Sequence, residues 1–174
     1  MQNSELKVLK SEKEIRERVA QMGAALTEKF KGKEPVAICV LNGSFVFYSD
    51  LIRAIDLDLT CEFLGVSSYQ DKLVSSGEVR LTLDLDVPLE GRDVILIEDL
   101  VDTGLTMSFL VETLRARKPK SLTSVVLLQK TPCLKIKSVT DMIGFETEGE
   151  FAVGYGIDHA GFYRNLPYLA IIPD

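Results

Sequence analysis

The chain has 174 residues, 46% of them hydrophobic, which suits one domain with a substantial core over residues 1–174. Its formal net charge of -6 disfavours general nucleic-acid binding, because such binding depends on a basic surface. The sequence shows no secretory signal, no apolar run long enough to span a bilayer and no CxxC pair among three cysteines. We therefore expect a soluble, cytoplasmic protein with free thiols and no membrane partner.

The first predicted element is an amphipathic helix. Ser11 and Glu14 have capping-box spacing, and the helix is expected to end near residues 31–33. Its apolar stripe consists of Ile15, Val19, Met22, Leu26 and Phe30. An apolar run at 36–41 predicts a buried strand, and the tight turn 42–44 leads into a second helix. The stripe expected on that second helix is Phe45, Tyr48, Ile52 and Ile55.

Two further strands are expected, at 59–66 and, from its alternating pattern, at 79–85. The polar, serine-rich segment 67–78 between them is longer than a hairpin requires. It is either a disordered loop or an active-site lid, and composition favours neither.

The remaining elements centre on the apolar strand 94–97. The helix after it carries its stripe at Met107, Leu110, Val111 and Leu114 and stops before Lys118. A strand at 122–128 and short strands at 142–145 and 151–155 follow, then a polar segment and an apolar terminus. Strands alternating with helices predict an α/β fold with a doubly wound, mostly parallel sheet and flanking helices.

Ligands of such sheets bind beyond the carboxyl ends of the strands. Four polar segments are expected there: 42–44, 98–106, 129–130 and the neighbourhood of Asp158. Segment 98–106 places three carboxylates just before a Thr-Gly-Leu-Thr run at a helix start. Three interpretations remain open: solvated acids with a simple helix cap, a magnesium-binding phosphoacceptor pocket, or a sugar-phosphate site. The absence of GxxxxGK[ST] and GxGxxG disfavours a P-loop or a dinucleotide site.

Residues 94–106 resemble the phosphoribosyl-pyrophosphate (PRPP) motif of the type I phosphoribosyltransferases. Segments 41–44, 68–69, 127–130 and 151–158 with 162–164 resemble the hypoxanthine-guanine branch of that family, in the same order along the chain. The resemblance implies that family's fold, with a small hood formed by terminal segments, and purine salvage from PRPP to hypoxanthine or guanine. It does not rank hypoxanthine, guanine and xanthine.

The resemblance also assigns roles to individual residues. Asp102 would be the general base, and the ribose-phosphate would be bound by Glu98, Asp99, Asp102, Thr103, Gly104, Leu105 and Thr106. Pyrophosphate would meet Asn42, Gly43 and Arg164, and the purine would meet Lys130, Phe151, Ala152 and Asp158. Ser68 and Tyr69 would belong to the lid. Mg²⁺ would be the cofactor, with Glu98, Asp99 and Asp158 as ligands, in a homodimer or homotetramer.

The chain departs from the family pattern at two positions. Asn42 stands where many relatives carry Lys or Arg, which implies weaker pyrophosphate binding. His159 stands where an aromatic residue is common, and we expect a structural role for it. Two other functions are alternatives: a regulatory RNA-binding protein on the same fold, and a magnesium-dependent phosphoacceptor domain.

Overall fold

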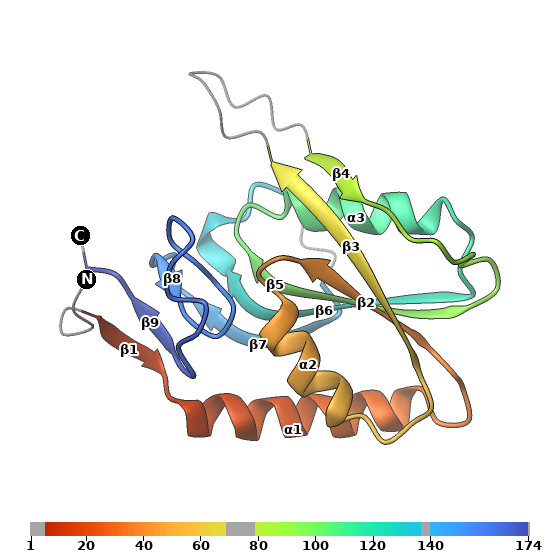
Figure 1. The fold of residues 1–174 in the computed structure, drawn as a ribbon, viewed down its shortest axis with the longest axis horizontal. Coiled ribbons are helices and arrows are strands. Elements are labelled where there is room, and N and C mark those ends of the chain that lie inside the picture. The colour runs from red at the N-terminus through yellow and green to blue at the C-terminus, as the bar shows by residue number, and fades with distance from the viewer. Residues whose placement is uncertain (1–5, 69–78, 137–139, 174) are drawn as a thin grey trace.

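The computed structural model describes residues 6–68, 79–136 and 140–173, and a six-stranded sheet forms its centre (Figure 1). The strand order is β4 (Val79–Leu83), β3 (Thr60–Ser68), β2 (Val36–Leu41), β5 (Asp93–Val101), β6 (Ser121–Lys130), β7 (Met142–Thr147). β3, β2, β5, β6 and β7 run parallel, and β4 pairs antiparallel with β3 at one edge. The prediction of a mostly parallel sheet is confirmed.

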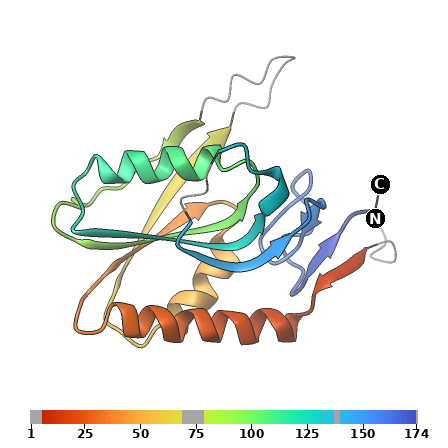
Figure 2. The same cartoon turned by 180° about the vertical axis from the view of Figure 1, so that it is seen from behind.

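Helices cover both faces of this sheet, as the view from behind also shows (Figure 2). α1 (Glu12–Lys29) and α2 (Phe45–Arg53) pack on one face, and α3 (Leu105–Arg115) packs on the other. The capping box at Ser11 is present, and every residue of the stripe predicted for α1 is buried. The stripe predicted for α3 is buried as well. The apolar spacing therefore identified the inward faces of both helices.

The face predicted for α2 is right only in part, because Tyr48 and Ile55 are buried and Ile52 packs against the same core. Phe45, however, is 47% exposed, and Phe47 and Leu51, which were not predicted, are buried beside Tyr48. Four consecutive residues at the start of this helix are apolar or aromatic, so their spacing fitted more than one face. The direction in which the preceding turn leads into α2 decides between the faces.

Strand limits differ from the predicted ones where polar residues extend a strand. β5 continues through the carboxylates to Val101, and β6 continues through Gln129 and Lys130, which were expected in a turn. Both extensions are held by backbone pairing: Glu98 pairs with Val126, and Val101 pairs with Gln129. Backbone pairing is indifferent to side-chain polarity, so the hydrophobic pattern missed these ends.

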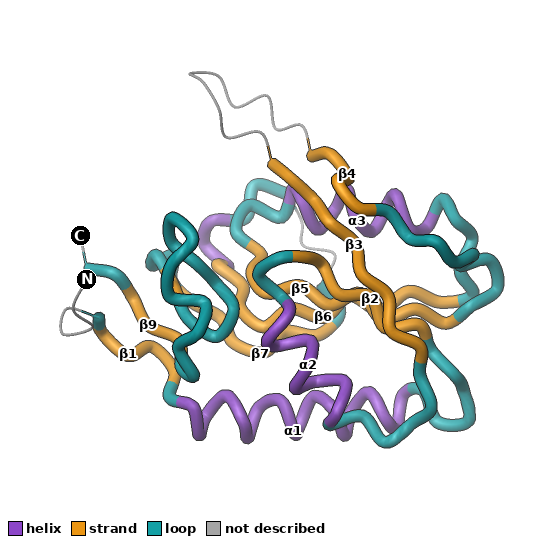
Figure 3. Tube along the Cα trace, in the orientation of Figure 1, coloured by secondary structure: helices purple, strands orange, loops and turns teal. Residues whose placement is uncertain are grey.

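A second, antiparallel sheet forms the hood, with strand order β1 (Lys7–Lys10), β9 (Leu169–Ile171), β8 (Ala152–Val153) (Figure 3). It joins segments from the two ends of the described chain, as the resemblance implied. β1 was not recognised as a strand, because its four residues alternate weakly and are partly exposed. None of the helices in the described ranges is long and apolar enough to cross a membrane.

The three cysteines are free, as predicted. Cys39 is fully buried in β2, and burial together with the nearby Glu98 and Asp99 raises the pKa of its thiol to about 12. Cys39 is therefore an unreactive core residue at neutral pH.

Candidate functional site

The carboxyl ends of the parallel strands meet at one edge of the sheet, and predicted site residues follow them. Asn42 follows β2, Asp102 follows β5, and Lys130 ends β6. The hood approaches the same edge, because the Phe151 ring lies near Lys130 and Gly156 lies against the turn after β2. Residues from four separate segments thus converge, as the predicted topology required.

The turn after β2 makes the closest backbone approach in the site. Its Leu41–Asn42 peptide bond is cis, and an added Cβ on Gly43 would lie 1.7 Å from Oδ2 of Asp99. From the other side, a Cβ on Gly156 would lie 2.2 Å from the Gly43 carbonyl oxygen. A Cβ at Gly156 would strike backbone, and one at Gly43 would require the Asp99 side chain to move, so the turn, the end of β5 and the hood are in direct contact.

Glu98 and Asp99 are carboxylates in a poorly solvated place. Burial raises the pKa of Glu98 well above its usual value, and the charge of Asp99 adds to the effect. Burial also raises the pKa of Asp99 to about 6, partly opposed by backbone hydrogen bonds and Arg164, and reinforced by Asp158. Oε2 of Glu98 is buried without a hydrogen-bond partner among the described residues. Such carboxylates suit a ligand that brings hydroxyl donors or a cation.

Glu98 also lines a small cavity of about 100 Å³ at the start of α3. The other side is formed by Thr103, Gly104 and Thr106, with Gly104 in the left-handed conformation at the helix N-cap. The first turn of α3 contains no acidic residue, so its free N–H groups present a positive end to the cavity. A phosphate group is the ligand that this arrangement favours.

A second group of side chains gathers around Lys130. Its Nζ lies 3.4 Å from Oδ2 of Asp102 and 5.8 Å from the centroid of the Phe151 ring. The Lys130 side chain is nine-tenths buried, whereas that of Asp102 is 52% exposed and Phe151 is half exposed. The arrangement presents an ammonium donor, a carboxylate acceptor and an open aromatic ring to one space, which suits a flat heterocycle.

The turn after the hood strand holds Asp158 against Arg164. Their Oδ1 and Nη2 atoms are 2.6 Å apart, and Nη1 of Arg164 donates to the Gly156 carbonyl oxygen at 2.7 Å. Arg164 lowers the pKa of Asp99 whereas Asp158 raises it, so both charges act on the end of β5. The pair therefore lies near the end of β5 and, through Gly156, near the predicted pyrophosphate turn.

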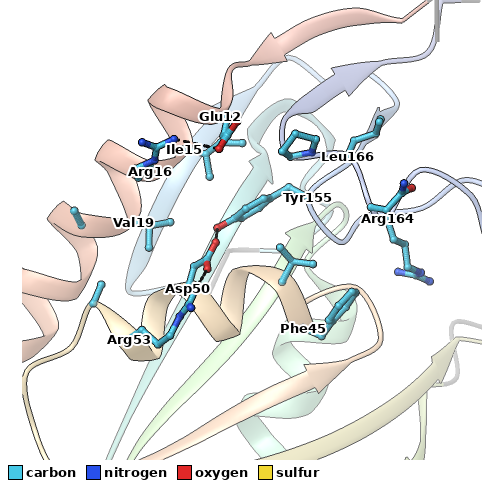
Figure 4. Close-up of a pocket in the computed structure, with 15 residues that line it drawn as sticks. Glu12, Ile15, Arg16, Val19, Phe45, Asp50, Arg53, Tyr155, Arg164 and Leu166 are labelled. Atoms are coloured by element: carbon cyan, nitrogen blue, oxygen red, sulfur yellow. Dashed lines mark hydrogen bonds and ion pairs between the residues drawn. The ribbon is translucent and has the colours of Figure 1, made fainter.

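Two residues of this neighbourhood were not foreseen. Tyr155, buried in the hood, donates a hydrogen bond of 2.5 Å to Oδ2 of Asp50 on α2 (Figure 4). The pair borders a larger cavity of about 880 Å³ between α1, α2 and the segment around Leu166. Asp50 and Tyr155 are 105 positions apart, and no local pattern in the sequence could have joined them.

Other predicted site residues are placed only in part. Ser68 ends β3, its side chain lies outside the described structure, and Tyr69 lies outside the described residues altogether. Ala152 is buried in β8, and its backbone pairs with Ile171. Among the described residues, no three His, Cys, Asp or Glu side chains form a group that could by itself hold a metal ion.

Comparison with known proteins agrees with this geometry. The phosphoribosyl transferase domain family matches residues 6–160. A hypoxanthine-guanine phosphoribosyltransferase of Bacillus subtilis is 49% identical over 166 residues, covering 95% of this chain and 92% of that protein. One from Dictyostelium discoideum is 45% identical, covering 93% and 92%.

Solved structures give the same result. The crystal structure of a hypoxanthine-guanine phosphoribosyltransferase from Bacillus anthracis superposes with a TM-score of 0.91 at 42% identity, covering 96% of this chain and 98% of that one. A hypoxanthine phosphoribosyltransferase from Staphylococcus aureus gives 0.92 at 40% identity, covering 98% and 93%. These matches favour the sugar-phosphate interpretation of segment 98–106 over a phosphoacceptor pocket. The chain belongs to the phosphoribosyltransferase family and groups with its hypoxanthine-guanine members.

Proposed function

We propose that residues 1–174 act as one domain that transfers the 5-phosphoribosyl group of PRPP to hypoxanthine or guanine. A purine ring nitrogen bonds to C1 of the ribose, and the bond from C1 to pyrophosphate breaks with its electron pair. The products are IMP or GMP and pyrophosphate. The observation that carries the proposal is the grouping of Lys130, Asp102 and Phe151 next to a phosphate-binding helix start.

The ribose-phosphate half of the site is built on β5 and α3. The 5-phosphate binds at the helix start, to N–H and hydroxyl donors of Thr103, Gly104, Leu105 and Thr106. Glu98 and Asp99 accept hydrogen bonds from the ribose hydroxyls, which supplies the donors that Oε2 of Glu98 lacks. In their ionised form, these carboxylates also stabilise the positive charge that develops on the sugar as its bond to pyrophosphate breaks.

The base binds between the hood and the end of β6. Phe151 stacks on the purine, and the backbone at Ala152 meets its edge. Lys130 donates to the 6-oxo group, a contact that the 6-amino group of adenine would not accept. Asp102, partly open to solvent and near Lys130, takes the proton of the attacking ring nitrogen.

Pyrophosphate leaves on the side of the hood turn. The backbone of Asn42 and Gly43 and the guanidinium of Arg164 are its donors, and Asp158 lies at the border with the base site. Asn42 brings no side-chain charge, so we expect weaker pyrophosphate binding than a Lys or Arg would give.

Mg²⁺ fits this side of the site, because Asp99 and Asp158 lie near enough for Asp158 to raise the pKa of Asp99. Proteins often hold Mg²⁺ through one or two carboxylates plus substrate phosphate oxygens, so a protein-only cage is not required. Glu98 would be the third carboxylate near the ion. The bound ion would neutralise the charge that develops on the leaving pyrophosphate.

The segment that begins at Ser68 and Tyr69 would close over the reacting centre and exclude water. We also propose that the chain works as a homodimer or homotetramer, on the pattern of the family that it resembles. The mass of the protein in solution, measured by light scattering, tests that assembly directly.

A substrate panel tests the function. The purified protein is incubated with Mg²⁺, PRPP and, in turn, hypoxanthine, guanine, xanthine and adenine, and the nucleotides formed are separated by chromatography. We expect IMP and GMP, with adenine unreactive because of Lys130. If neither IMP nor GMP forms, the proposed function is wrong. Formation of AMP instead would refute the role of Lys130.

A further inference from the structure

A tight turn holds His159, the only histidine of the chain, in a defined place. His159 and Phe162 exchange two backbone hydrogen bonds, of 3.2 and 3.0 Å. Between them Ala160 and Gly161 have φ angles of 51° and 84°, the values typical of a type I′ turn. The N–H of Gly161 donates to Oδ2 of Asp158 at 2.7 Å. Backbone contacts therefore set the position of His159, whichever side chain it carries.

The imidazole of His159 lies against Phe151. The two ring centroids are 5.1 Å apart and the rings are nearly perpendicular, at 85°. Phe151 is half exposed, and the ammonium of Lys130 lies 5.8 Å from the centroid of its ring. Its backbone is anchored separately, because its carbonyl accepts the N–H of Ile172 at 3.2 Å. His159 and Lys130 therefore both contact the ring on which the purine is proposed to stack.

We infer that His159 is a positioning residue, which holds the Phe151 ring in the orientation that receives the purine. The inference rests on the proposed function, because it assumes that Phe151 is the stacking surface for the base. His159 acts through the contact between the two rings and transfers no proton. Lys130 is assigned to the 6-oxo group of the purine, whereas the ring contact of His159 in the described structure is with Phe151.

Steady-state kinetics of His159→Ala and His159→Phe test the inference. We expect His159→Ala to raise the KM for hypoxanthine about two- to tenfold, the range that one edge-to-face ring contact corresponds to. The KM for PRPP should stay within about twofold of the parent value, because the backbone turn that holds Asp158 remains. His159→Phe restores a perpendicular ring contact and should return the KM for hypoxanthine to near the parent value.

Phe162→Ala is the matched control, since Phe162 belongs to the same turn, is 64% exposed and makes no ring contact in the described structure. We expect parent kinetics from it. An unchanged KM for hypoxanthine in His159→Ala would overturn the inference. An equal rise in the KM for hypoxanthine and the KM for PRPP would also overturn it. So would a His159→Phe variant whose KM for hypoxanthine stays as high as that of His159→Ala. If the parent protein itself forms no nucleotide, the proposed function fails first, and the parent assay alone shows it.

Discussion

Single residues of this site differ sharply in their solvation. Asp102 is half exposed, whereas Glu98, four positions before it, is buried with one oxygen unpaired in the described structure. This difference in exposure fits the proposed roles. A general base must exchange protons with solvent, whereas the unpaired oxygen of a ribose-binding carboxylate receives its hydrogen bonds when the ribose binds. Sequence could identify both as acids but not their solvation, which depends on how β5 extends beneath the hood.

We expect Asp102→Asn to lower kcat about a hundred- to ten-thousandfold, the usual contribution of a positioned base. The amide keeps the shape of the side chain but cannot take a proton, so the KM for PRPP should change much less. Steady-state kinetics measures both quantities. Asp56→Asn, an exposed acid just before β3 at the other end of the sheet, serves as the control. Parent turnover in Asp102→Asn would exclude Asp102 as the base.

Asp99 leads to a prediction about stability and pH. Because its pKa is raised to about 6 in the folded protein, its protonated form is favoured there, and its contribution to folding is present at low pH and lost as pH rises through about 6. A two-unit shift corresponds to about 3 kcal/mol, and partial solvent access reduces it. Asp99→Asn should therefore stabilise the free protein, relative to the parent, by about 1–2 kcal/mol more at pH 8 than at pH 4.

Urea unfolding at the two pH values measures this difference, with Asp56→Asn as the exposed control. The Asp99→Asn variant also removes the charge that helps to raise the pKa of Glu98, which acts in the same direction. A stability difference that does not change between pH 4 and pH 8 would contradict the prediction.

At the scale of elements, turns from opposite ends of the chain meet at Gly156 and Gly43. Gly156 has a φ of 101°, and its missing Cβ would strike a backbone carbonyl. Gly91 has a φ of 72° with no atom within 4 Å of a built Cβ. Alanine at either position would have to adopt a left-handed backbone conformation, but only at Gly156 would its Cβ also collide with a neighbouring atom. Gly91→Ala is therefore the control for Gly156→Ala.

We expect Gly91→Ala to cost about 1 kcal/mol of unfolding free energy, the strain of a left-handed alanine. Gly156→Ala should cost more, because the Gly43 carbonyl or the hood must move. It should also raise the KM for PRPP, whereas Gly91→Ala should leave that KM unchanged. Denaturant unfolding and PRPP kinetics test both points, and equal effects of the two variants would contradict the role of the contact.

The bond between Tyr155 and Asp50 joins the hood to α2. Tyr155→Phe removes only the hydroxyl and should lower the unfolding free energy by about 1.5–3 kcal/mol, the value of a hydrogen bond to a charged group. Tyr168→Phe is the control, since its hydroxyl makes no hydrogen bond in the described parts of the chain. Thermal and urea unfolding give the two values. A loss no larger than that of the control would show that the bond contributes little.

The sequence predicted best the elements whose apolar residues recur at one clear spacing or form one continuous run. α1 and α3 show their buried faces in their apolar spacing, and β2 has the predicted limits. The buried Phe47 and Leu51 of α2 and the strand β1 were missed, because each depends on partners that are distant along the chain. The resemblance to a known family supplied the hood and most site roles, which periodicity alone could not.

At the scale of the whole molecule, the ribose-phosphate half and the base half of the site depend on different sheets. The ribose-phosphate half stands on β5 and α3 in the centre of a six-stranded sheet, and the base half depends on a three-stranded hood. The central strands β2, β5 and β6 are buried along most of their length, whereas β1 is partly exposed and pairs irregularly with β9. This difference in burial between the two sheets could not be predicted from the sequence, because it depends on which strands pair.

The pairing of β1 with β9 joins the two ends of the described chain, and this has a consequence for local opening. Protection against amide hydrogen exchange follows the depth and cooperativity of the surrounding structure. We expect amides of β1 and β9 to exchange faster than those of β5 and β6 in the free protein, as measured by mass spectrometry. Equal protection would show that the two sheets open together. Unequal protection would mean that the free protein loses its base-binding half transiently while its phosphate-binding half stays formed.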